Sequence, residues 1–384
     1  MGDHVARARA LQPLVRDAAP KAEAERCLPE NVALAMAEAG LYRVATPVAY
    51  GGADASPLTQ IEVIEAISEA DGATGWNLMI GIEALGLMAL TFPQGAELFA
   101  DPLTILASST AAIGTAERAD GGYCVNGTWQ FVSGVHNSHW FGGLVHRHRN
   151  GERIGGRTPV YAVLARAEIE ILDTWHVGGM RGSGSNDVRV EDRFVPDERI
   201  AVPDPVWTAR LHVESPITRI PLSVRLAYNK VAVALGIARG AVDDFVDLAQ
   251  GKTPRFGSTL LAERPFAQRA VATAEVRLRS ARALVMELVE EIWAAVLEGR
   301  AVDQRQRAFF QVASSDAVSG CAEAVATVAE AAGTTANFLA SPLERRVRDA
   351  RVVGQHVTVA PHLIEDGGRV MLGLPPESFI LRLP

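Results

Sequence analysis

The sequence predicts an α+β protein in which a central β domain lies between two helical domains. Apolar residues recur at helical spacing near both ends of the chain, whereas the middle is rich in Gly, Thr and Val and contains short alternating runs. The expected domains are residues 1–102, 103–205 and 206–384. Two or three domains suit a chain of 384 residues, of which 48% are hydrophobic.

The first domain should contain several helices. Apolar residues keep helical spacing from Asn31 to Gly40, where the glycine suits a C-terminal cap. Further helices are expected to begin near Pro57 and near Trp76. The most apolar stretch, residues 76–92, is shorter than the roughly 20 residues of a membrane span, and Glu83 interrupts it. We therefore expect a buried helix there.

The middle domain shows the signals of strands and turns. Gly121-Gly122 and Asn126-Gly127 are turn signals on either side of a short β-prone segment. Strands are predicted over residues 158–164 and 186–194, because apolar and polar residues alternate in the second of these runs.

The last domain contains three long apolar stripes that are rich in alanine, which allows helices to pack closely. They predict a helical bundle that is buried further by oligomerisation. The stripes are Val231, Ala234, Leu235, Ala238, Val242 and Phe245; Val271, Ala274, Leu278, Ala281, Val285, Leu288 and Ile292; and Phe310, Ala313, Ala317, Cys321, Ala324, Val328 and Ala331.

Composition argues against several classes of function. A net charge of −8 does not attract phosphate backbones, so no nucleic-acid partner is expected. Residues 1–10 lack an apolar signal core, which predicts a cytoplasmic protein with no membrane association. The three cysteines are far apart and no histidines show ligand spacing, so no metal is expected. Motifs for dinucleotide binding, a P-loop and a nucleophilic serine elbow are missing from the sequence.

Several segments in register resemble the acyl-CoA dehydrogenase superfamily over nearly the whole chain. The resemblance implies a helical N-terminal domain, a central β-barrel-like domain and a C-terminal four-helix bundle. The matching segments are Ala39-Gly40-Leu41-Tyr42 with Pro47 and Tyr50-Gly51-Gly52; residues 179–187 with Val190-Glu191-Asp192 and Val195-Pro196; Ala332-Gly333; Pro342-Leu343-Glu344-Arg345; and Arg348-Asp349-Ala350.

Two features resemble the hydroxylase branch of this superfamily more than the dehydrogenases. Residues 107–116 lack the acidic residues and proline of the dehydrogenase flavin loop, and residues 127–134 follow the two-component hydroxylase pattern Gly-x-Trp-x-Phe-x-Ser-Gly. Where straight-chain dehydrogenases have Tyr-Glu, this chain has His356-Val357, and valine cannot remove a proton. Some dehydrogenases hold their base on another helix, so that branch stays open.

The resemblance implies a reduced-flavin-dependent monooxygenase. Reduced FMN or FAD would come from a separate reductase, and a flavin hydroperoxide would carry oxygen from O2 to a small aromatic or electron-rich substrate. His356, titrating near neutrality, could donate to the peroxide or help remove a phenolic proton. The alternatives are an FAD-dependent acyl-CoA dehydrogenase and a catalytically silent flavin-binding or scaffold protein.

The same resemblance assigns roles around the flavin. Ser133 stands where the family places a hydroxyl near flavin N5, followed by Gly134. Ser183 and Ser185 lie in a glycine-rich turn whose N–H groups suit a pyrophosphate or a ring edge. Gln268 matches a segment that reaches the flavin of a neighbouring subunit, in keeping with the homotetramer usual for the family. Trp129 and Phe131 would pack on the flavin ring or fill the β domain.

Three residues are candidates for the substrate pocket: Glu83, His139 and Trp140. Trp140 could equally belong to the core. A carboxylate within an apolar helix is unfavourable unless it is paired. Glu83 therefore either lines the pocket or pairs with an arginine, and the second alternative is slightly favoured.

Overall fold

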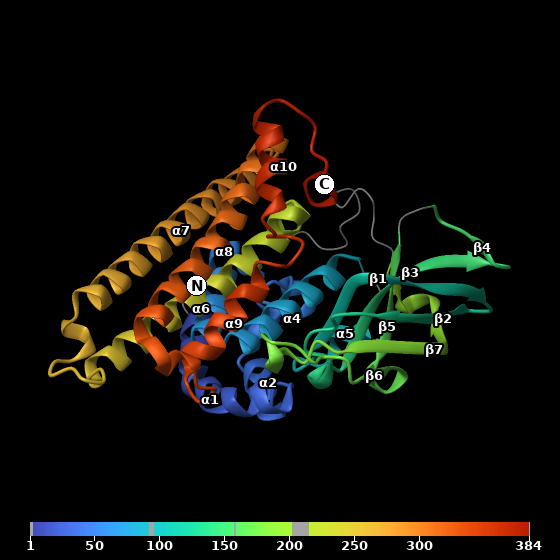
Figure 1. Cartoon of the computed structure of the whole chain (residues 1–384). Coiled ribbons are helices and arrows are strands. Elements are labelled where there is room, and N and C mark those ends of the chain that lie inside the picture. The colour runs from blue at the N-terminus through green and yellow to red at the C-terminus, as the bar shows by residue number, and fades with distance from the viewer. Residues whose placement is uncertain (1–2, 92–95, 157–158, 202–214, 384) are drawn as a thin grey trace.

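The computed structural model describes residues 3–91, 96–156, 159–201 and 215–383, and it has the predicted order of helices, sheet and helices (Figure 1). The predicted boundary at residues 205 and 206 lies outside the described residues, as do Phe92 and Thr158 at the ends of two predicted elements. The first boundary falls between a short helix that ends at Ala100 and a strand that begins at Leu106.

Five helices form the N-terminal part, and local capping explains where they begin and end. Gly40 has a φ of +72° after the second helix, as its cap position requires. The third helix begins at Pro57, where the Ser56 hydroxyl accepts a hydrogen bond from the Thr59 backbone N–H. The fourth begins before Trp76, because Asp71 accepts from Thr74. The helices are α1 (Asp3–Glu25), α2 (Glu30–Glu38), α3 (Pro57–Ala70), α4 (Gly72–Thr91) and α5 (Ala96–Ala100).

The central domain is one sheet in the order β6-β7-β2-β1-β3-β5-β8, with β4 paired to β3. β1 and β3 pair in parallel, and every other pairing within the described residues is antiparallel. The strands are β1 (Leu106–Ala119), β2 (Gly122–Trp129), β3 (Trp140–Arg149), β4 (Glu152–Arg153), β5 (Val160–Ala165), β6 (Glu170–Leu172), β7 (Asp187–Pro196) and β8 (Ile200–Ala201).

One predicted turn in this domain is wrong. Gly121 does turn the chain between β1 and β2, with a φ of +72°. Asn126-Gly127 lies inside β2, where the pairing with β7 shifts register between Val125 and Gly127. An Asn-Gly pair is a strong turn signal, but here it marks a bulge in the strand.

The sheet encloses its own apolar core, as the barrel-like prediction requires. Trp129 is fully buried there, donates its Nε1–H to the carbonyl oxygen of Leu144 over 2.9 Å, and meets the Phe141 ring edge-on. The connection from β2 to β3 contains the short helix η3 (Val135–Asn137). Because β1 and β3 are parallel neighbours, this connection must cross over the end of the sheet, and it brings Ser133 to the helical side.

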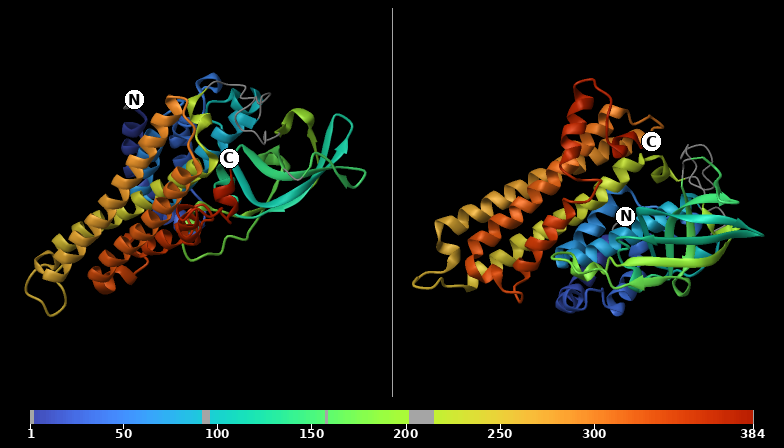
Figure 2. Two further views of the ribbon diagram at one scale, coloured as in Figure 1. Left: turned by 90° about the horizontal axis from the view of Figure 1, so that it is seen from above. Right: turned by 45° about the vertical axis from the view of Figure 1, so that its right-hand side comes forward.

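The C-terminal domain is the predicted helical bundle, in which the long helices α6 to α8 extend away from the sheet (Figure 2). All six stripe residues of α6 are at most 2% exposed. The α7 stripe is only partly covered, since Val271, Ala281 and Leu288 are half-buried. The helices are α6 (Leu222–Gly251), α7 (Pro265–Leu297), α8 (Gln304–Ala332), α9 (Pro342–Val353), α10 (His362–Met371) and α11 (Phe379–Arg382).

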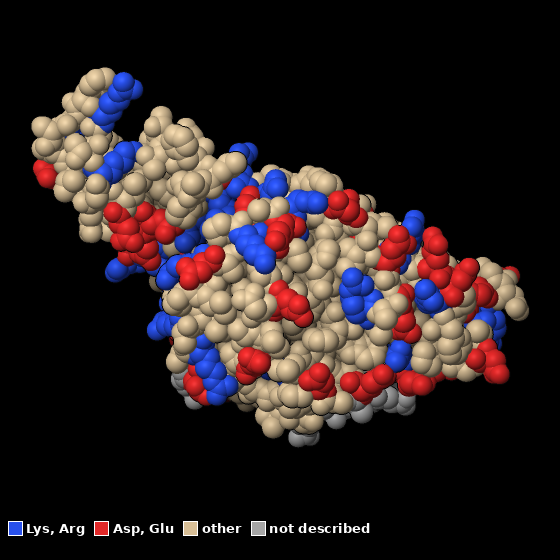
Figure 3. Space-filling model, turned by 90° about the horizontal axis from the view of Figure 1, so that it is seen from below, with Lys and Arg blue, Asp and Glu red and all other residues tan. Residues whose placement is uncertain are grey.

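The surface drawn in Figure 3 carries acidic and basic side chains interspersed over the helices and the sheet. In the part of the chain that the structure describes, no helix is both long enough and apolar enough to cross a membrane.

Candidate active site

Three serine hydroxyls meet on the side of the sheet that faces the helices. The Ser133 and Ser185 oxygens are 2.7 Å apart, and the Ser185 and Ser183 oxygens are 2.6 Å apart. Trp76 of α4 donates its indole N–H to the Ser133 oxygen over 3.0 Å. The structure therefore brings together three predicted residues and adds Trp76, which was not among the predicted site residues.

The turn that carries Ser183 and Ser185 has an unusual backbone. The helix η5 (Arg181–Ser183) stands between two left-handed residues, Met180 and Gly184, with φ values of 55° and 54°. A Cβ atom at Gly184 would lie 3.1 Å from the carbonyl oxygen of Arg26, so any larger residue there would force its neighbours to shift. The Gly134 N–H donates to the carbonyl oxygen of Ser183 over 3.0 Å and locks the two segments together.

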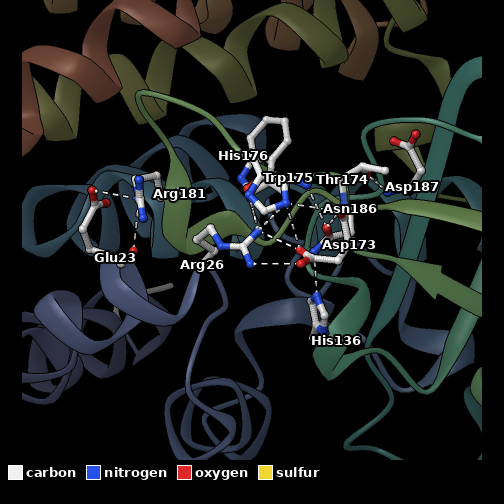
Figure 4. A network of polar contacts seen from close by, with 10 residues as sticks. All are labelled: Glu23, Arg26, His136, Asp173, Thr174, Trp175, His176, Arg181, Asn186 and Asp187. Atoms are coloured by element: carbon white, nitrogen blue, oxygen red, sulfur yellow. Dashed lines mark hydrogen bonds and ion pairs between the residues drawn. The ribbon is translucent and has the colours of Figure 1, made fainter.

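A polar network holds this turn from its outer side (Figure 4). The side-chain oxygen of Asn186 accepts from the backbone N–H groups of Thr174 and Trp175, both over 2.9 Å, and its amide nitrogen lies 2.8 Å from His136 Nε2. Arg181 pairs with Glu23 of α1 at 3.3 Å. Burial, followed by the charge of Arg166, lowers the pKa of His136, which favours the neutral ring as the acceptor of the Asn186 N–H.

Two buried carboxylates and one arginine tie the turn to α4 and α9. Asp349 of α9 is 1% exposed and accepts a hydrogen bond from the Met180 N–H over 2.6 Å. Asp71, which caps α4, lies 3.2 Å from Arg345 of α9. Burial and then the charge of Asp71 raise the pKa of Asp349 to about 7. The turn at η5 carries Ser183, α4 carries Trp76, and His356 follows the end of α9, so these contacts fix the relative positions of three site residues.

His356 lies in the loop after α9, and its ring meets Trp76 edge-on at 5.5 Å between centroids. The backbone N–H of Thr358 donates to His356 Nδ1 over 3.3 Å, and the Thr358 hydroxyl is 2.9 Å from the same atom. Because Nδ1 accepts, the proton of the neutral ring belongs on Nε2, which becomes a donor.

The protonation state of His356 corrects one expectation. Burial, followed by the charge of Lys230, lowers its pKa to about 3. The ring is therefore neutral at pH 7, and it does not titrate near neutrality as the sequence analysis expects. A neutral imidazole can still donate its Nε2–H.

Glu83 is paired, but with a lysine instead of the expected arginine. Its Oε1 lies 2.6 Å from the Lys230 ammonium and accepts a hydrogen bond from the Asn229 amide over 3.0 Å. Both partners belong to α6, in a stretch that is otherwise buried and apolar. Neither Lys230 nor Asn229 is among the site residues predicted from the sequence. The available signal was Glu83, the single charged residue in the sequence of α4, together with Lys230 directly before the apolar run 231–235 of α6.

Of the two aromatic residues predicted to contact the flavin, Trp129 is buried and Phe131 is exposed. Trp129 fills the core of the sheet, which was the alternative left open for it. Phe131, just past the end of β2, has a φ of 57°, is 59% exposed, and meets Trp175 edge-on at 6.2 Å. Phe131 is therefore the aromatic side chain of this pair that is available to a ligand.

Three other predicted residues do not join the serine cluster by any contact in the described part of the chain. His139 Nδ1 accepts from the Ile105 backbone N–H over 3.0 Å, and Arg199 stacks over the Trp140 ring at 4.8 Å. Gln268 belongs to the first turn of α7, and it donates to the carbonyl oxygen of Ala262. The start of α7 lies at the end of the bundle away from the sheet (Figure 1). A role for Gln268 at the flavin of a neighbouring subunit stays a prediction.

The site has the features that a flavin ring edge requires. Three buried hydroxyls converge, and the exposed ring of Phe131 precedes Ser133 by two residues in the chain. The side-chain oxygen of Asn77 is buried without a hydrogen-bond partner among the described residues, and it would lie 3.4 Å from a Cβ atom on Gly134. Ser133, Ser183, Ser185 and Phe131 would hold such a ring. No group of three or more His, Cys, Asp or Glu side chains suited to a metal was found within residues 3–91, 96–156, 159–201 and 215–383.

Comparison with known proteins identifies the family. Residues 6–97 match the N-terminal domain of acyl-CoA dehydrogenase, and residues 228–361 match its C-terminal domain. The chain belongs to the acyl-CoA dehydrogenase family.

Within this family the similar proteins are oxygenases. The chain is 34% identical to an indole-3-acetate monooxygenase of Pseudomonas putida over 94% of this chain and 92% of the relative. It is 29% identical to the oxygenase component of an FADH2-dependent resorcinol hydroxylase of Rhizobium, over 97% of this chain and 95% of that protein. The crystal structure of a 3-HSA hydroxylase from Rhodococcus superimposes with a TM-score of 0.88 at 28% identity, covering 99% of both chains.

These relatives confirm the branch that His356-Val357 and the Gly127–Gly134 pattern predict. They support a flavin-dependent monooxygenase over an acyl-CoA dehydrogenase.

Proposed function

We propose that this chain is the oxygenase component of a two-component flavin-dependent monooxygenase. It takes reduced FMN or FAD from a separate reductase, uses O2, and adds one oxygen atom to a small aromatic or electron-rich molecule. The observation that carries this proposal is the contact of Trp76 with both Ser133 and His356, which places a hydroxyl and a neutral imidazole at one site. At the position of the dehydrogenase base stands Val357, whose side chain is apolar and 55% exposed.

The residues of the chain supply positioning and hydrogen bonds. Reduced flavin, when bound, supplies the electrons that activate O2. The Ser133 oxygen accepts the Trp76 N–H and lies 2.7 Å from the Ser185 oxygen, so when Ser185 donates to Ser133, the Ser133 proton can be donated to an acceptor at the ring edge. His356 offers its Nε2–H from a fixed tautomer without carrying charge. Such donors act strongly where water is excluded, and the Trp76 ring fills the space between the two side chains.

The function is tested by mixing the full chain, loaded with reduced FMN or reduced FAD, with oxygen in a stopped-flow instrument. We expect transient absorbance in the near ultraviolet that outlasts that of the free flavin. Acyl-CoA thioesters should leave the oxidised flavin coloured. Rapid bleaching by an acyl-CoA, with no transient after oxygen, would instead establish a dehydrogenase.

His356→Ala should slow substrate oxygenation by about 10²-fold and raise the share of reduced flavin that is lost as hydrogen peroxide. The reason is the loss of one fixed donor, which typically lowers rates by about this factor. His148→Ala on β3 is the matched control and should change neither quantity. Unchanged coupling in the His356 variant would show that this ring only packs against Trp76.

We further propose that the protein is a cytoplasmic homotetramer. Support comes from apolar side chains left exposed on α7 and α8, including Val276 at 66% and Phe309 at 41%, and from the half-covered α7 stripe. Gln268 would then act at the neighbouring subunit. Light scattering at micromolar concentration should give four times the chain mass of 41.0 kDa, whereas a monomer would contradict the proposal.

A further inference from the structure

Glu83 lies on the same side of α4 as Trp76. The two residues are two helical turns apart, which places their side chains on one face of the helix. Trp76 uses that face to contact Ser133 and His356. Glu83 thus extends the same side of the site further along α4.

The two side chains of the Glu83–Lys230 ion pair differ in solvent exposure. The Lys230 side chain is 1% exposed, whereas that of Glu83 is 10% exposed. Lys230 is therefore closed to solvent, and Glu83 is the member of the pair whose side chain a small molecule can approach. The negative charge of Glu83 also raises the pKa of Tyr161 on β5, although burial is the larger cause, so the carboxylate lies between α4, α6 and the sheet.

The carboxylate retains room for a further donor. Oε1 receives Lys230 and Asn229, whereas Oε2 receives Lys230 alone among the described contacts. Two carboxylate oxygens offer about four acceptor positions. Lys230 and Asn229 hold the group in one orientation and leave a free position on Oε2.

We propose that Glu83 Oε2 accepts a hydrogen bond from an O–H or N–H group on the aromatic substrate. This inference rests on the proposed function and narrows its substrate class to neutral aromatic molecules that carry such a donor, as phenols and indoles do. A carboxylate or phenolate group has no proton to donate to Oε2, and the Lys230 cation is already paired with Glu83. A hydrogen bond to a carboxylate polarises the O–H or N–H bond and enriches the ring in electrons, which suits attack by an electrophilic oxygen.

The test compares ligands that differ only in the donor: phenol with anisole, and indole with 1-methylindole. Binding to the full chain is measured by calorimetry. A hydrogen bond to a charged group corresponds to roughly a tenfold to hundredfold difference in affinity, so wild type should prefer phenol and indole by at least about tenfold.

Two variants test whether the preference for ligands with an O–H or N–H donor depends on Glu83. Glu83→Gln keeps an acceptor without charge and should reduce the preference. Because it leaves Lys230 unpaired, a second variant, Glu83→Leu/Lys230→Met, removes both charges and should abolish the preference while circular dichroism shows a folded chain. Equal binding by wild type within each pair, or a preference that persists in the double variant, would overturn the inference. Tighter binding of benzoate than of phenol would also overturn it.

These outcomes are separate from a failure of the proposed function, since binding needs neither oxygen nor reduced flavin. A donor preference without any oxygen-dependent transient would remove the monooxygenase proposal alone. A transient with equal oxygenation of phenol and anisole would remove this inference alone.

Discussion

Lys230→Met is expected to lower the free energy of unfolding by about 3–5 kcal/mol. Methionine is unbranched like lysine and one atom shorter. The variant therefore fills most of the same space but leaves the Glu83 carboxylate buried without its cation, which is unfavourable. The Asn229 amide still donates to Oε1, but it brings no charge. Urea unfolding of wild type and variant at one protein concentration measures the difference.

The double variant Glu83→Leu/Lys230→Met separates charge from packing in this prediction. It should recover most of the lost stability, because two apolar side chains leave no unpaired charge. The control is Arg277→Met, which breaks an exposed ion pair with Glu323 and should change stability by less than about 1 kcal/mol. A double variant as unstable as Lys230→Met would show that packing, rather than charge, explains the effect.

Asp349→Asn is expected to remove much of the pH dependence of stability between pH 4 and pH 7. Burial and Asp71 raise the pKa of Asp349 from 3.8 to about 7 in the folded protein. The folded state therefore holds a proton that the unfolded state releases above pH 4. The stability that Asp349 contributes is full below pH 4 and is lost as the pH rises to 7, by on the order of 4 kcal/mol.

The asparagine variant keeps a side-chain oxygen for the Met180 N–H but cannot ionise. Its unfolding free energy should fall less than that of wild type across this pH range, so the variant should be the more stable protein at pH 8. Asp247→Asn, on the exposed side of α6, is the matched control and should follow wild type. A variant with the wild-type slope would assign the pH dependence to other groups.

The fold was accessible from sequence wherever a local rule fixes the backbone. Gly40 and Pro57 mark helix ends by their own conformational preferences, and the apolar stripe of α6 is fully buried as its period predicts. The turn predicted at Asn126-Gly127 was wrong because the backbone flexibility of an Asn-Gly pair suits both a hairpin turn and a bulge within a paired strand. The choice between the two depends on the neighbouring strand β7, which the local sequence does not reveal.

The site was predictable only where a motif carries it. Ser133, Ser183 and Ser185 stand in segments that match the family, and the structure joins them. Trp76 and Lys230 belong to no such segment, and their roles arise from contacts between helices far apart in the chain. The sequence did not show which of Trp129 and Phe131 is buried, because both are aromatic. Trp129 is the last residue of β2 and is buried in the sheet, whereas Phe131 lies beyond the strand and is exposed.

The residues around Trp76 come from widely separated parts of the chain, namely α4, the β2–β3 connection, η5 and the loop after α9. Contacts between distant segments form late, because long loops must close first. We therefore expect the site around Trp76 to be completed late in folding. A ligand held there favours the native state by mass action and cannot guide its formation. Its kinetic effect falls on the rate of unfolding, so it extends the lifetime of the finished protein without hastening its folding.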